Sequence, residues 1–255
     1  MCDVCGCPGG ADDVHVAGSA VPAASGHIDI HQALLRDNDH MAAHNRAHFA
    51  AAGTLVVNLM SSPGAGKTRL LEATIPALRG RMSMAVIEGD LATENDADRI
   101  RAAGAPAIQI TTGSACHLDA NMVHAALHWL DLSSIDVLFI ENVGNLVCPA
   151  CFDLGQHRNV VLLSITEGDD KPQKYPVMFR AADLVALTKL DLLAAVGDFN
   201  PGRARRHVRE LANAAPVLEL SARGGAGLPA WIAWLESERA ACRVPAPARH
   251  AASHG

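Results

Sequence analysis

The stretch Ser61-Ser62-Pro63-Gly64-Ala65-Gly66-Lys67-Thr68 indicates the fold class. It lies between an apolar run at residues 55–60 and a helical segment that begins at Thr68. Glycines let backbone amides turn toward phosphate groups, and the N-terminus of the following helix adds positive potential. Lys67 would reach the outer phosphates and Thr68 would ligate Mg²⁺. The strict pattern has Gly where this chain has Ser61, but the strand-loop-helix context and the intact Gly-Lys-Thr ending favour a phosphate-binding loop over an ordinary Gly-rich turn.

Short apolar runs recur on both sides of this loop, with longer helical stretches between them. The runs are residues 55–60, 84–87, 107–110, 137–140, 160–165, 184–187 and 217–220. Continuous apolar runs indicate strands that are buried on both faces, and their alternation with helices indicates a parallel sheet. The predicted fold class is therefore α/β, a doubly wound, mainly parallel sheet flanked by helices, of the Rossmann-like P-loop type.

The composition changes along the chain and predicts four regions. Residues 1–26 are rich in Gly, Ala and Ser and lack apolar periodicity, which predicts a flexible N-terminal arm. Residues 27–53 are predicted to form a helical segment, with the helix itself at about 28–50. The nucleotide-binding domain is expected at residues 54–240. Residues 241–255 are Pro- and Ala-rich and are predicted to be a disordered tail.

The overall composition excludes several classes of function. The 255 residues carry a formal net charge of −6, so no basic face for nucleic acid or an anionic membrane is indicated. Aromatic residues make up only 4%, which argues against a base-stacking platform. We expect no membrane insertion and no secretory signal, and hence a cytoplasmic protein. The 7 cysteines fall in local groups, a distribution typical of metal or redox chemistry in that compartment.

A second motif, Thr188-Lys189-Leu190-Asp191, follows the apolar run at 184–187 and favours guanine over adenine. An Asp at a strand end can accept hydrogen bonds from the guanine N1 and N2 hydrogens, and the stem of Lys189 can pack along the base. Thr188 stands where many GTPases carry Asn, which predicts looser anchoring of this loop. Ser221-Ala222, after the next strand, could supply a backbone amide to the guanine oxygen. The expected nucleotide contacts are Gly64, Ala65, Gly66, Lys67, Thr68, Arg69, Lys189, Asp191, Ser221 and Ala222.

Carboxylates that follow two other strands are expected near the γ-phosphate, because ligands bind at the carboxyl ends of parallel strands. We assign Asp90 to the Mg²⁺ shell together with Thr68, and Glu141 to Mg²⁺ or the attacking water. Lys67, Glu141 and Asp90 are accordingly the predicted catalytic residues. Asp96 and Asp98 either join this group or form a solvated helix start.

A potential metal site lies inside the nucleotide-binding half. Thiolate and imidazole ligands from Cys116, His117 and Cys148 suit Zn²⁺ or Ni²⁺, and a second copy of the chain or water would have to complete the coordination. Cys148 follows Glu141 by seven residues, so contacts at the γ-phosphate could move a metal ligand. Cys151 is either a further ligand or a small buried side chain.

Two further groups near the N-terminus could hold metal. Cys2-Asp3-Val4-Cys5-Gly6-Cys7 offers three thiolates that Gly6 allows to converge, and a backbone nitrogen would complete a near-planar set suited to Ni²⁺. The alternative is a redox Cys-x-x-Cys, although that motif usually opens a helix in a folded domain. His40, His44 and His48 share one helical face, which is more often solvated than metal-binding.

Together these features resemble the hydrogenase nickel-incorporation GTPases of the HypB family, over about residues 28–240 and the N-terminal cysteine motif. The most specific stretches are the phosphate loop, Glu141-Asn142-Val143-Gly144-Asn145-Leu146-Val147-Cys148-Pro149 and Phe152-Asp153-Leu154-Gly155. The resemblance implies a P-loop GTPase of the SIMIBI class. It implies slow hydrolysis of GTP to GDP with Mg²⁺, and delivery of Ni²⁺ to the precursor of the [NiFe]-hydrogenase large subunit.

The same resemblance implies partners and ligand sets. The expected partners are a second copy, in a homodimer formed on GTP or metal binding, and a small zinc-containing HypA-like protein. Cys116, His117 and Cys148 match the family's metal site in the GTPase domain. Cys2, Cys5 and Cys7 match a high-affinity nickel motif that only some members carry. The chain lacks the long polyhistidine tract of other members, which disfavours bulk nickel storage.

Three alternatives remain open at this point. The chain could deliver nickel to another enzyme such as urease. It could store metal, with nucleotide binding incidental. It could also be an ATP-dependent kinase, which nucleotide competition would reveal.

Overall fold

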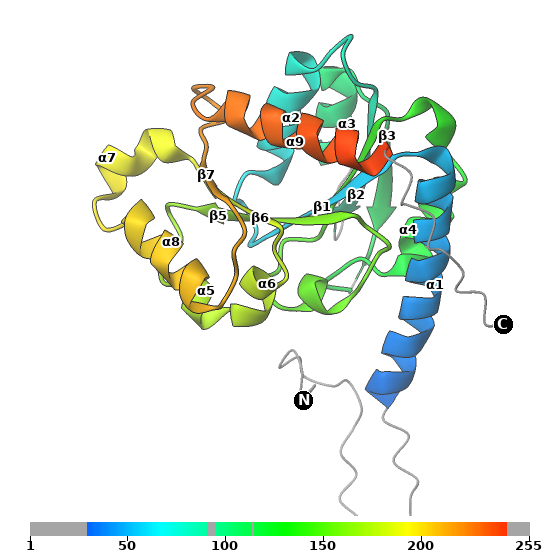
Figure 1. Cartoon of the computed structure of the whole chain (residues 1–255), viewed down its shortest axis with the longest axis horizontal. Coiled ribbons are helices and arrows are strands. Elements are labelled where there is room, and N and C mark those ends of the chain that lie inside the picture. Colours follow the sequence, from blue (N-terminus) through cyan, green and yellow to red (C-terminus); the bar gives the residue numbers. More distant parts are fainter. Residues whose placement is uncertain (1–29, 91–94, 114, 244–255) are drawn as a thin grey trace, which may run out of the picture.

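A computed structural model describes residues 30–90, 95–113 and 115–243 (Figure 1). The predicted arm at residues 1–26, with Cys2, Cys5 and Cys7, lies outside the described residues. The first helix, α1 (Ile30–Ala52), agrees with the helix predicted at about 28–50. It ends where Gly53 adopts a left-handed φ of 64° and the Thr54 amide donates to the Phe49 carbonyl at 3.0 Å, a common helix termination.

The centre of the molecule is a sheet of seven strands, all parallel, in the order β3-β2-β4-β1-β5-β6-β7. Every predicted apolar run forms a strand, so the predicted fold class is confirmed. The strands are β1 (Leu55–Ser61), β2 (Met84–Asp90), β3 (Ala107–Thr111), β4 (Val137–Glu141), β5 (Arg158–Ser164), β6 (Leu184–Thr188) and β7 (Val217–Glu219).

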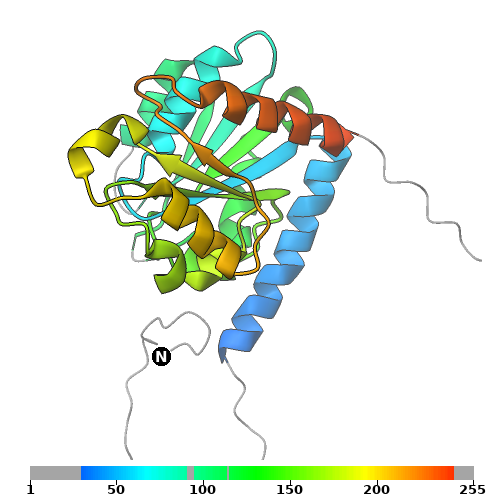
Figure 2. The ribbon, with the colours of Figure 1, turned by 60° about the vertical axis from the view of Figure 1, so that its left-hand side comes forward.

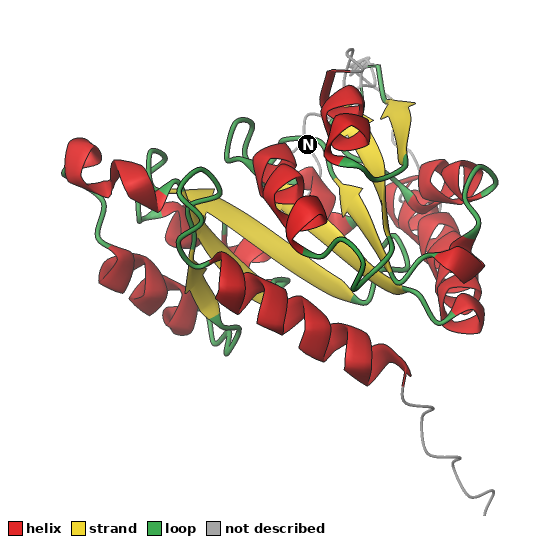
Figure 3. Ribbon diagram, turned by 90° about the horizontal axis from the view of Figure 1, so that it is seen from above, coloured by secondary structure: helices red, strands yellow, loops and turns green. Residues whose placement is uncertain are grey.

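Helices cover both faces of this sheet (Figures 1 and 3). The longer ones are α2 (Lys67–Ala77), α3 (Asn95–Ala103), α4 (Ala120–Leu127), α8 (Pro201–Glu210) and α9 (Leu228–Arg243). Short helical segments are α5 (Lys171–Lys174), α6 (Pro176–Arg180), α7 (Leu193–Val196), η1 (Leu132–Ser134), η2 (Cys148–Cys151) and η3 (Leu190–Leu192).

Side chains of the strands alternate between the two helical layers, as the two-residue period of a strand requires. Along β1, Leu55 and Val57 pack with α2, α3 and α9, whereas Val56 packs with α1 and α4. Further along the same second face, residues of β5 and β6 pack against α6 and α8. This two-sided burial accounts for the uninterrupted apolar runs of the strands.

The last helix corrects one predicted boundary. α9 runs to Arg243, so it extends into the segment 241–255 that was predicted to be a disordered tail. The helix is held on the sheet by Trp231, which is fully buried and donates from Nε1 to the Thr74 hydroxyl of α2 at 2.9 Å. Near its end, the Cys242 thiol lies 3.9 Å from the Thr54 carbonyl oxygen. These contacts explain why the Ala-rich end of α9 stays helical.

α1 lies alongside α4, as Figures 1 and 2 both show. Two buried asparagines of α1 join it to the domain. Asn38 accepts from the Ala120 amide at 2.9 Å, and its own amide group donates to the Asp153 carbonyl at 2.8 Å. Asn45 donates to the carbonyls of Ala120 and Leu154 at 2.9 and 3.2 Å. The helix that precedes the first strand is therefore an integral part of the fold.

Candidate nucleotide and metal sites

The phosphate loop follows β1, which lies between β4 and β5, the point where the sheet order reverses and open α/β sheets bind ligands. Gly64 and Gly66 have left-handed φ angles of 74° and 100°, a conformation that glycine adopts without strain. Gly66 is the residue from which α2 begins. The backbone amides at the start of α2 consequently point toward the position expected for phosphate.

Lys67 and Thr68 both lie against Glu141, the last residue of β4. The Thr68 hydroxyl donates to Glu141 Oε1 at 2.8 Å, and Lys67 Nζ lies 3.8 Å from the same oxygen. Lys67 Nζ also donates to the Ser61 hydroxyl at 3.3 Å. Ser61, which interrupts the strict motif, thus accepts a hydrogen bond from the loop lysine. The side chains of Ser61, Lys67, Thr68 and Glu141 are all largely buried.

A second buried carboxyl group, that of Glu88 on β2, lies beside Glu141. The register between β2 and β4 places Glu88 directly opposite Glu141. Burial, followed by the charge of Glu141, raises the pKa of Glu88 to about 11. Burial also raises the pKa of Glu141, against the opposing effects of Lys67 and Thr68. Within the described residues, Oε2 of each carboxyl accepts no hydrogen bond, so the pair has free acceptor oxygens for a cation.

The carboxylates gather differently from the prediction. Oxygens of Glu88, Asp96 and Glu141 lie within 4.8 Å of one another, and Asp90 is not part of this group. Asp90 ends β2 two residues past Glu88, with its carbonyl accepting from the Thr112 amide at 2.9 Å. The sequence-based prediction did not include Glu88. The available signal was a carboxylate that directly follows the apolar residues Val86 and Ile87.

Asp96 and Asp98 separate into the two roles that the sequence left open. Asp96 joins the carboxylate group and also accepts from Arg99 at 2.5 Å. Asp98 pairs with Arg101 at 2.7 Å, with 70% of its side chain exposed, and so belongs to a solvated helix start. Oxygen ligands and a threonine hydroxyl suit Mg²⁺, and the residues that fit it here are Thr68, Glu141, Glu88 and Asp96.

The second motif borders a cavity of about 230 Å³ next to the phosphate loop. Its lining includes the predicted contacts Ala65, Gly66, Arg69, Lys189, Asp191 and Ala222. Asp191 Oδ1 accepts from the Ser221 hydroxyl at 2.6 Å, and this hydrogen bond is the main reason that the pKa of Asp191 is lowered. An ionised Asp191 is a pure acceptor, which is what pairing with the guanine N1 and N2 hydrogens requires.

Thr188 and Lys189 connect this pocket to the phosphate loop. The Thr188 hydroxyl donates to the Ala65 carbonyl at 2.6 Å, in a buried position. The looser anchoring predicted for Thr in place of Asn is therefore compensated by a direct link. Lys189 has a left-handed φ of 60°, which is uncommon for a non-glycine residue and tends to occur at binding sites.

The three predicted ligands inside the domain lie close together. The two sulfur atoms of Cys116 and Cys148 and a ring nitrogen of His117 lie within 4.8 Å of one another. The His117 ring stacks on Phe152 at 3.9 Å between centroids, and burial lowers its pKa. A neutral imidazole with two thiols fits Zn²⁺ or Ni²⁺. Cys151 is outside this group; its sulfur lies 3.8 Å from the Val147 carbonyl oxygen.

The loop from Glu141 to Cys148 contacts both sites. A Cβ atom on Gly144 would lie 2.7 Å from the Cα of Pro63 in the phosphate loop, so only glycine allows this approach. On the other side, Asn145 donates to the Cys116 carbonyl at 3.4 Å, and Asn142 accepts from the Leu118 amide at 3.1 Å. The segment that carries Cys148 thus spans the distance between phosphate loop and metal ligands.

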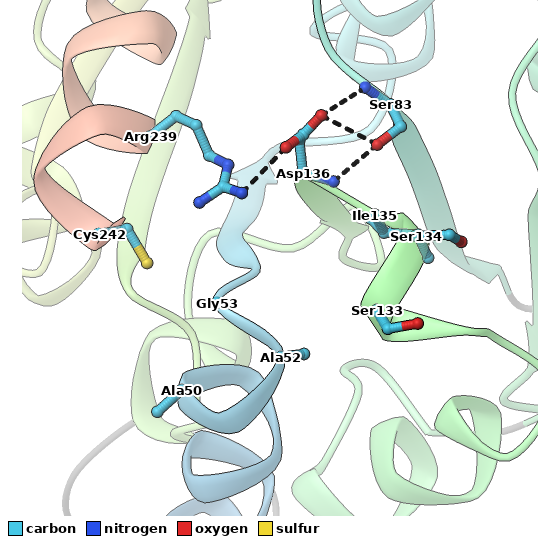
Figure 4. A pocket seen from close by; sticks show the side chains of 10 residues that line it. All are labelled: Ala50, Ala52, Gly53, Ser83, Ser133, Ser134, Ile135, Asp136, Arg239 and Cys242. Atoms are coloured by element: carbon cyan, nitrogen blue, oxygen red, sulfur yellow. Dashed lines mark hydrogen bonds and ion pairs between the residues drawn. The ribbon is translucent and has the colours of Figure 1, made fainter. Parts of the chain in front are cut away.

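A larger cavity, about 580 Å³, lies at the opposite end of the sheet (Figure 4). It is bordered by Gly53, Ser83 and Asp136, which precede β1, β2 and β4, so it is remote from the strand ends that carry the phosphate loop. Asp136 accepts from Arg239 of α9 at 2.9 Å and from the Ser83 amide at 2.9 Å. The residues around this cavity hold α9 against the beginnings of the strands. The cavity is not the nucleotide site.

Comparison with known proteins gives consistent matches. Residues 55–219 match the family described as CobW/HypB/UreG, nucleotide-binding domain. The hydrogenase maturation factor HypB of Azotobacter vinelandii is 53% identical over 212 residues, which cover 83% of this chain and 70% of that protein. The hydrogenase/urease maturation factor HypB of Helicobacter hepaticus is 47% identical over 194 residues, covering 74% of this chain and 79% of that protein.

A solved structure agrees with the fold. The crystal structure of HypB from Helicobacter pylori in complex with nickel matches with a TM-score of 0.77 at 40% identity, covering 83% of this chain and 99% of that one. In the part of the chain that the structure describes, no helix combines the length and apolar character needed to cross a membrane.

Proposed function

The chain belongs to the HypB family of hydrogenase maturation factors, within the CobW/HypB/UreG group of nucleotide-binding proteins, and on this premise we propose that it is a GTP-hydrolysing metallochaperone. In this proposal it binds nickel and controls the delivery of nickel to a [NiFe]-hydrogenase precursor in the cytoplasm. The loop from Glu141 to Cys148 is the observation that carries the proposal. One end contacts Lys67 and Thr68, and the other supplies a metal ligand.

The nucleotide half of the proposal assigns roles to the phosphate loop and the guanine pocket. Lys67 would bind the outer phosphates in place of its present partner Glu141. Thr68, Glu141, Glu88 and Asp96 would hold Mg²⁺, which supplies charge neutralisation at the phosphates. Glu141 is also the residue that would orient the attacking water. The acceptor geometry at Asp191 supports GTP over ATP, because adenine lacks the matching hydrogens.

The second part of the proposal concerns nickel, which the chain would carry at two thiol sites. Cys116, His117 and Cys148 would bind Ni²⁺ or Zn²⁺ in the domain. The motif Cys2-Asp3-Val4-Cys5-Gly6-Cys7 would be a second, tethered nickel site. Three ligands leave coordination positions open at the internal site. A second copy in a homodimer would fill them, and a small zinc-containing HypA-like protein would exchange metal with this chain.

The test is restoration of hydrogenase activity in cells that lack their own factor. Lys67→Ala is expected to abolish GTP hydrolysis and to fail in restoration. Lys174→Ala removes an exposed lysine that pairs with Asp170 at 2.6 Å, and this control should restore activity fully. Restoration by Lys67→Ala would contradict the proposal and favour metal storage. Preferential ATP binding in a competition assay would contradict the assignment of Asp191 and favour a kinase.

Delivery to urease is the second candidate, since the Helicobacter hepaticus relative is named a hydrogenase/urease maturation factor. The same variants separate the two targets when hydrogenase and urease activities are measured in one strain. Loss of both activities with Lys67→Ala, and return of both with the unmodified chain, would show that the chain supplies more than one enzyme.

A further inference from the structure

A cluster of histidines lies where α1 packs against α4, and it does not include any residue of the sites described above. His44 and His48 are exposed on α1, and His124 is half-buried on α4. Imidazole nitrogens of the three lie within 4.8 Å of one another. The α1 pair belongs to the helical face that sequence alone favoured as merely solvated. Packing against α4 adds a third ring that the sequence could not place there.

The spacing within the α1 pair matches a shared metal ion. His44 and His48 are one helical turn apart, and their Nε2 atoms are 3.0 Å apart. With metal–nitrogen bonds of about 2.0–2.1 Å, adjacent nitrogens are separated by about 2.9 Å in a square plane and about 3.3 Å in a tetrahedron. The two nitrogens, which share a hydrogen bond here, therefore already lie at a distance that one cation spans once that proton is lost.

The third ring has its orientation and tautomer set by Asn45. The Nδ2 group of Asn45 donates to the carbonyls of Ala120 and Leu154, so its Oδ1 must face the other way. Oδ1 lies 3.0 Å from His124 Nδ1. Because an amide oxygen only accepts, His124 Nδ1 carries the proton and Nε2 keeps its lone pair. A hydrogen bond of this kind, on the nitrogen that does not bind, is typical of histidine metal ligands.

Charge and a neighbouring ring favour the same assignment. Burial and then the nearby His44, His128 and His48 lower the pKa of His124. His128 lies one turn after His124 on α4, with ring centroids 5.1 Å apart. His128 is outside the cluster of three nitrogens, and water can fill a fourth coordination position.

We propose that His44, His48 and His124 form a binding site for a divalent transition metal ion, Ni²⁺ or Zn²⁺, that joins α1 to α4. α1 begins at Ile30, and α4 begins at Ala120, shortly after Cys116 and His117. The site would therefore tie together two helices that are distant in the sequence. It contains no residue of the phosphate loop and requires no nucleotide.

The test measures Ni²⁺ binding where the thiol sites cannot contribute. The parent protein carries Cys2→Ser, Cys5→Ser, Cys7→Ser and Cys116→Ser and is purified without a histidine tag. Ni²⁺ is titrated against a chromophoric chelator. Two variants of this parent are compared with it: one carries His44→Gln and His48→Gln, and the other carries His124→Gln. Each should weaken Ni²⁺ binding by at least the roughly 10- to 100-fold that loss of an outer-shell partner costs.

His40→Gln is the matched control, because His40 is exposed on the same helix one turn before His44 and is outside the cluster. It should bind Ni²⁺ like the parent. A second readout is hydrogen exchange of the α1 amides, which Ni²⁺ should slow in the parent and in His40→Gln but not in the cluster variants. Gln at position 124 retains a donor for Asn45, so folding is expected to persist.

Unchanged Ni²⁺ affinity in the cluster variants would overturn the proposal and leave a simple hydrogen bond between the α1 rings. An equal loss in His40→Gln, or α1 exchange that is insensitive to Ni²⁺ in the parent, would overturn it as well. None of these outcomes depends on GTP, so failure here is distinguishable from failure of the proposed GTPase function.

Discussion

Glu88 and Glu141 are two buried carboxyl groups that lie side by side on β2 and β4, and Glu141 is also close to Lys67. Ionising a carboxyl group away from water is unfavourable, and burial is the main reason that the pKa of each group is raised. The charge of Glu141 raises the pKa of Glu88 further. A divalent cation would remove this cost by neutralising both charges. We infer that the site is electrostatically suited to a cation, because a cation would stabilise the ionised form of both groups.

The first prediction concerns the pH dependence of stability. The pKa of Glu88 is raised from 4.5 to about 11. The contribution of this group to the free energy of unfolding is therefore complete below pH 4.5 and is lost as the pH rises toward 11. Glu88→Gln stays neutral throughout. Its stability relative to the unmodified protein should therefore increase from pH 6 to pH 8.5, by at most about 1.4 kcal/mol per pH unit. Urea unfolding without Mg²⁺ and nucleotide measures this difference.

Glu72→Gln provides the control with the opposite sign. A hydrogen bond from Arg99 is the main reason that the pKa of Glu72 is lowered, so its contribution is present above pH 4.5 and is lost only as the pH falls through the lowered value. Between pH 6 and pH 8.5, the difference in free energy of unfolding between Glu72→Gln and the unmodified protein should stay constant. A flat difference for Glu88→Gln as well would refute the assignment of a protonated Glu88.

At the scale of elements, the loop from Glu141 to Cys148 is a spacer packed on both sides. Gly144 meets the backbone of Pro63, and Asn145 holds the carbonyl of Cys116. A close backbone contact cannot absorb a displacement in the way a flexible side chain can. Movement of the phosphate loop should consequently be passed to the metal ligands through this element.

The second prediction is that Gly144→Ala perturbs both sites at once. The added methyl group would approach Pro63 Cα to 2.7 Å, so one of the two backbones must shift. Weaker GTP binding and an altered Ni²⁺ affinity at Cys116, His117 and Cys148 are expected together. Isothermal titration with each ligand measures both. A change confined to one ligand would mean that the loop does not connect the sites.

α1 is the second element whose role depends on buried polar groups. Asn45 is fully buried and makes hydrogen bonds to Ala120, Leu154 and His124. These hydrogen bonds fix the position of α1 along α4, whereas apolar packing alone would allow α1 to slide along its axis. Asn45 is the one of the two buried asparagines of α1 that also contacts a ring of the histidine cluster.

The third prediction is that Asn45→Ala destabilises the protein by about 1–3 kcal/mol, because two backbone carbonyls lose their buried donor. Arg46→Ala is the matched neighbour. Its ion pair with Asp153 is 47% and 37% exposed, so its loss should cost less than about 1 kcal/mol. Equal effects of the two changes in urea unfolding would contradict the role given to Asn45.

At the scale of the whole molecule, the nucleotide and metal sites share the carboxyl end of one parallel sheet. β1 and β4 are neighbours in it, and each continues into a functional loop: the phosphate loop after β1, and the loop to Cys148 after β4. A rigid sheet with two adjacent loops at one edge is suited to link occupancy of one site to geometry at the other.

The fourth prediction is that Ni²⁺ or Zn²⁺ affinity at Cys116, His117 and Cys148 differs between the GDP state and the state with a non-hydrolysable GTP analogue. Coupling of this kind typically amounts to about 1–3 kcal/mol, or roughly 5- to 150-fold. Chelator competition in both states, with oligomeric state measured in the same samples, tests it. Equal affinities would remove nucleotide control from the proposed function.

Much of the fold and part of the site follow from local patterns. Each strand was predictable because burial on both faces leaves a continuous apolar run. The phosphate loop and the Thr188–Asp191 motif were predictable because their chemistry needs particular residues at fixed spacing. Asp90 was predicted and Glu88 was missed, although both follow the same apolar run. Only the register between β2 and β4 shows that Glu88 faces Glu141.

The sequence by itself determined the layered α/β fold, the phosphate loop and the kinds of ligand that the chain can offer to a metal, since these depend on residues near one another in the chain. Only the tertiary structure decided which of them meet. Glu88 joins Glu141 through strand register, Gly144 meets Pro63 through the order of β1 and β4, and His124 joins His44 and His48 through the packing of α1 on α4. Each contact joins residues that are distant in sequence, and its geometry is set by packing of the whole domain.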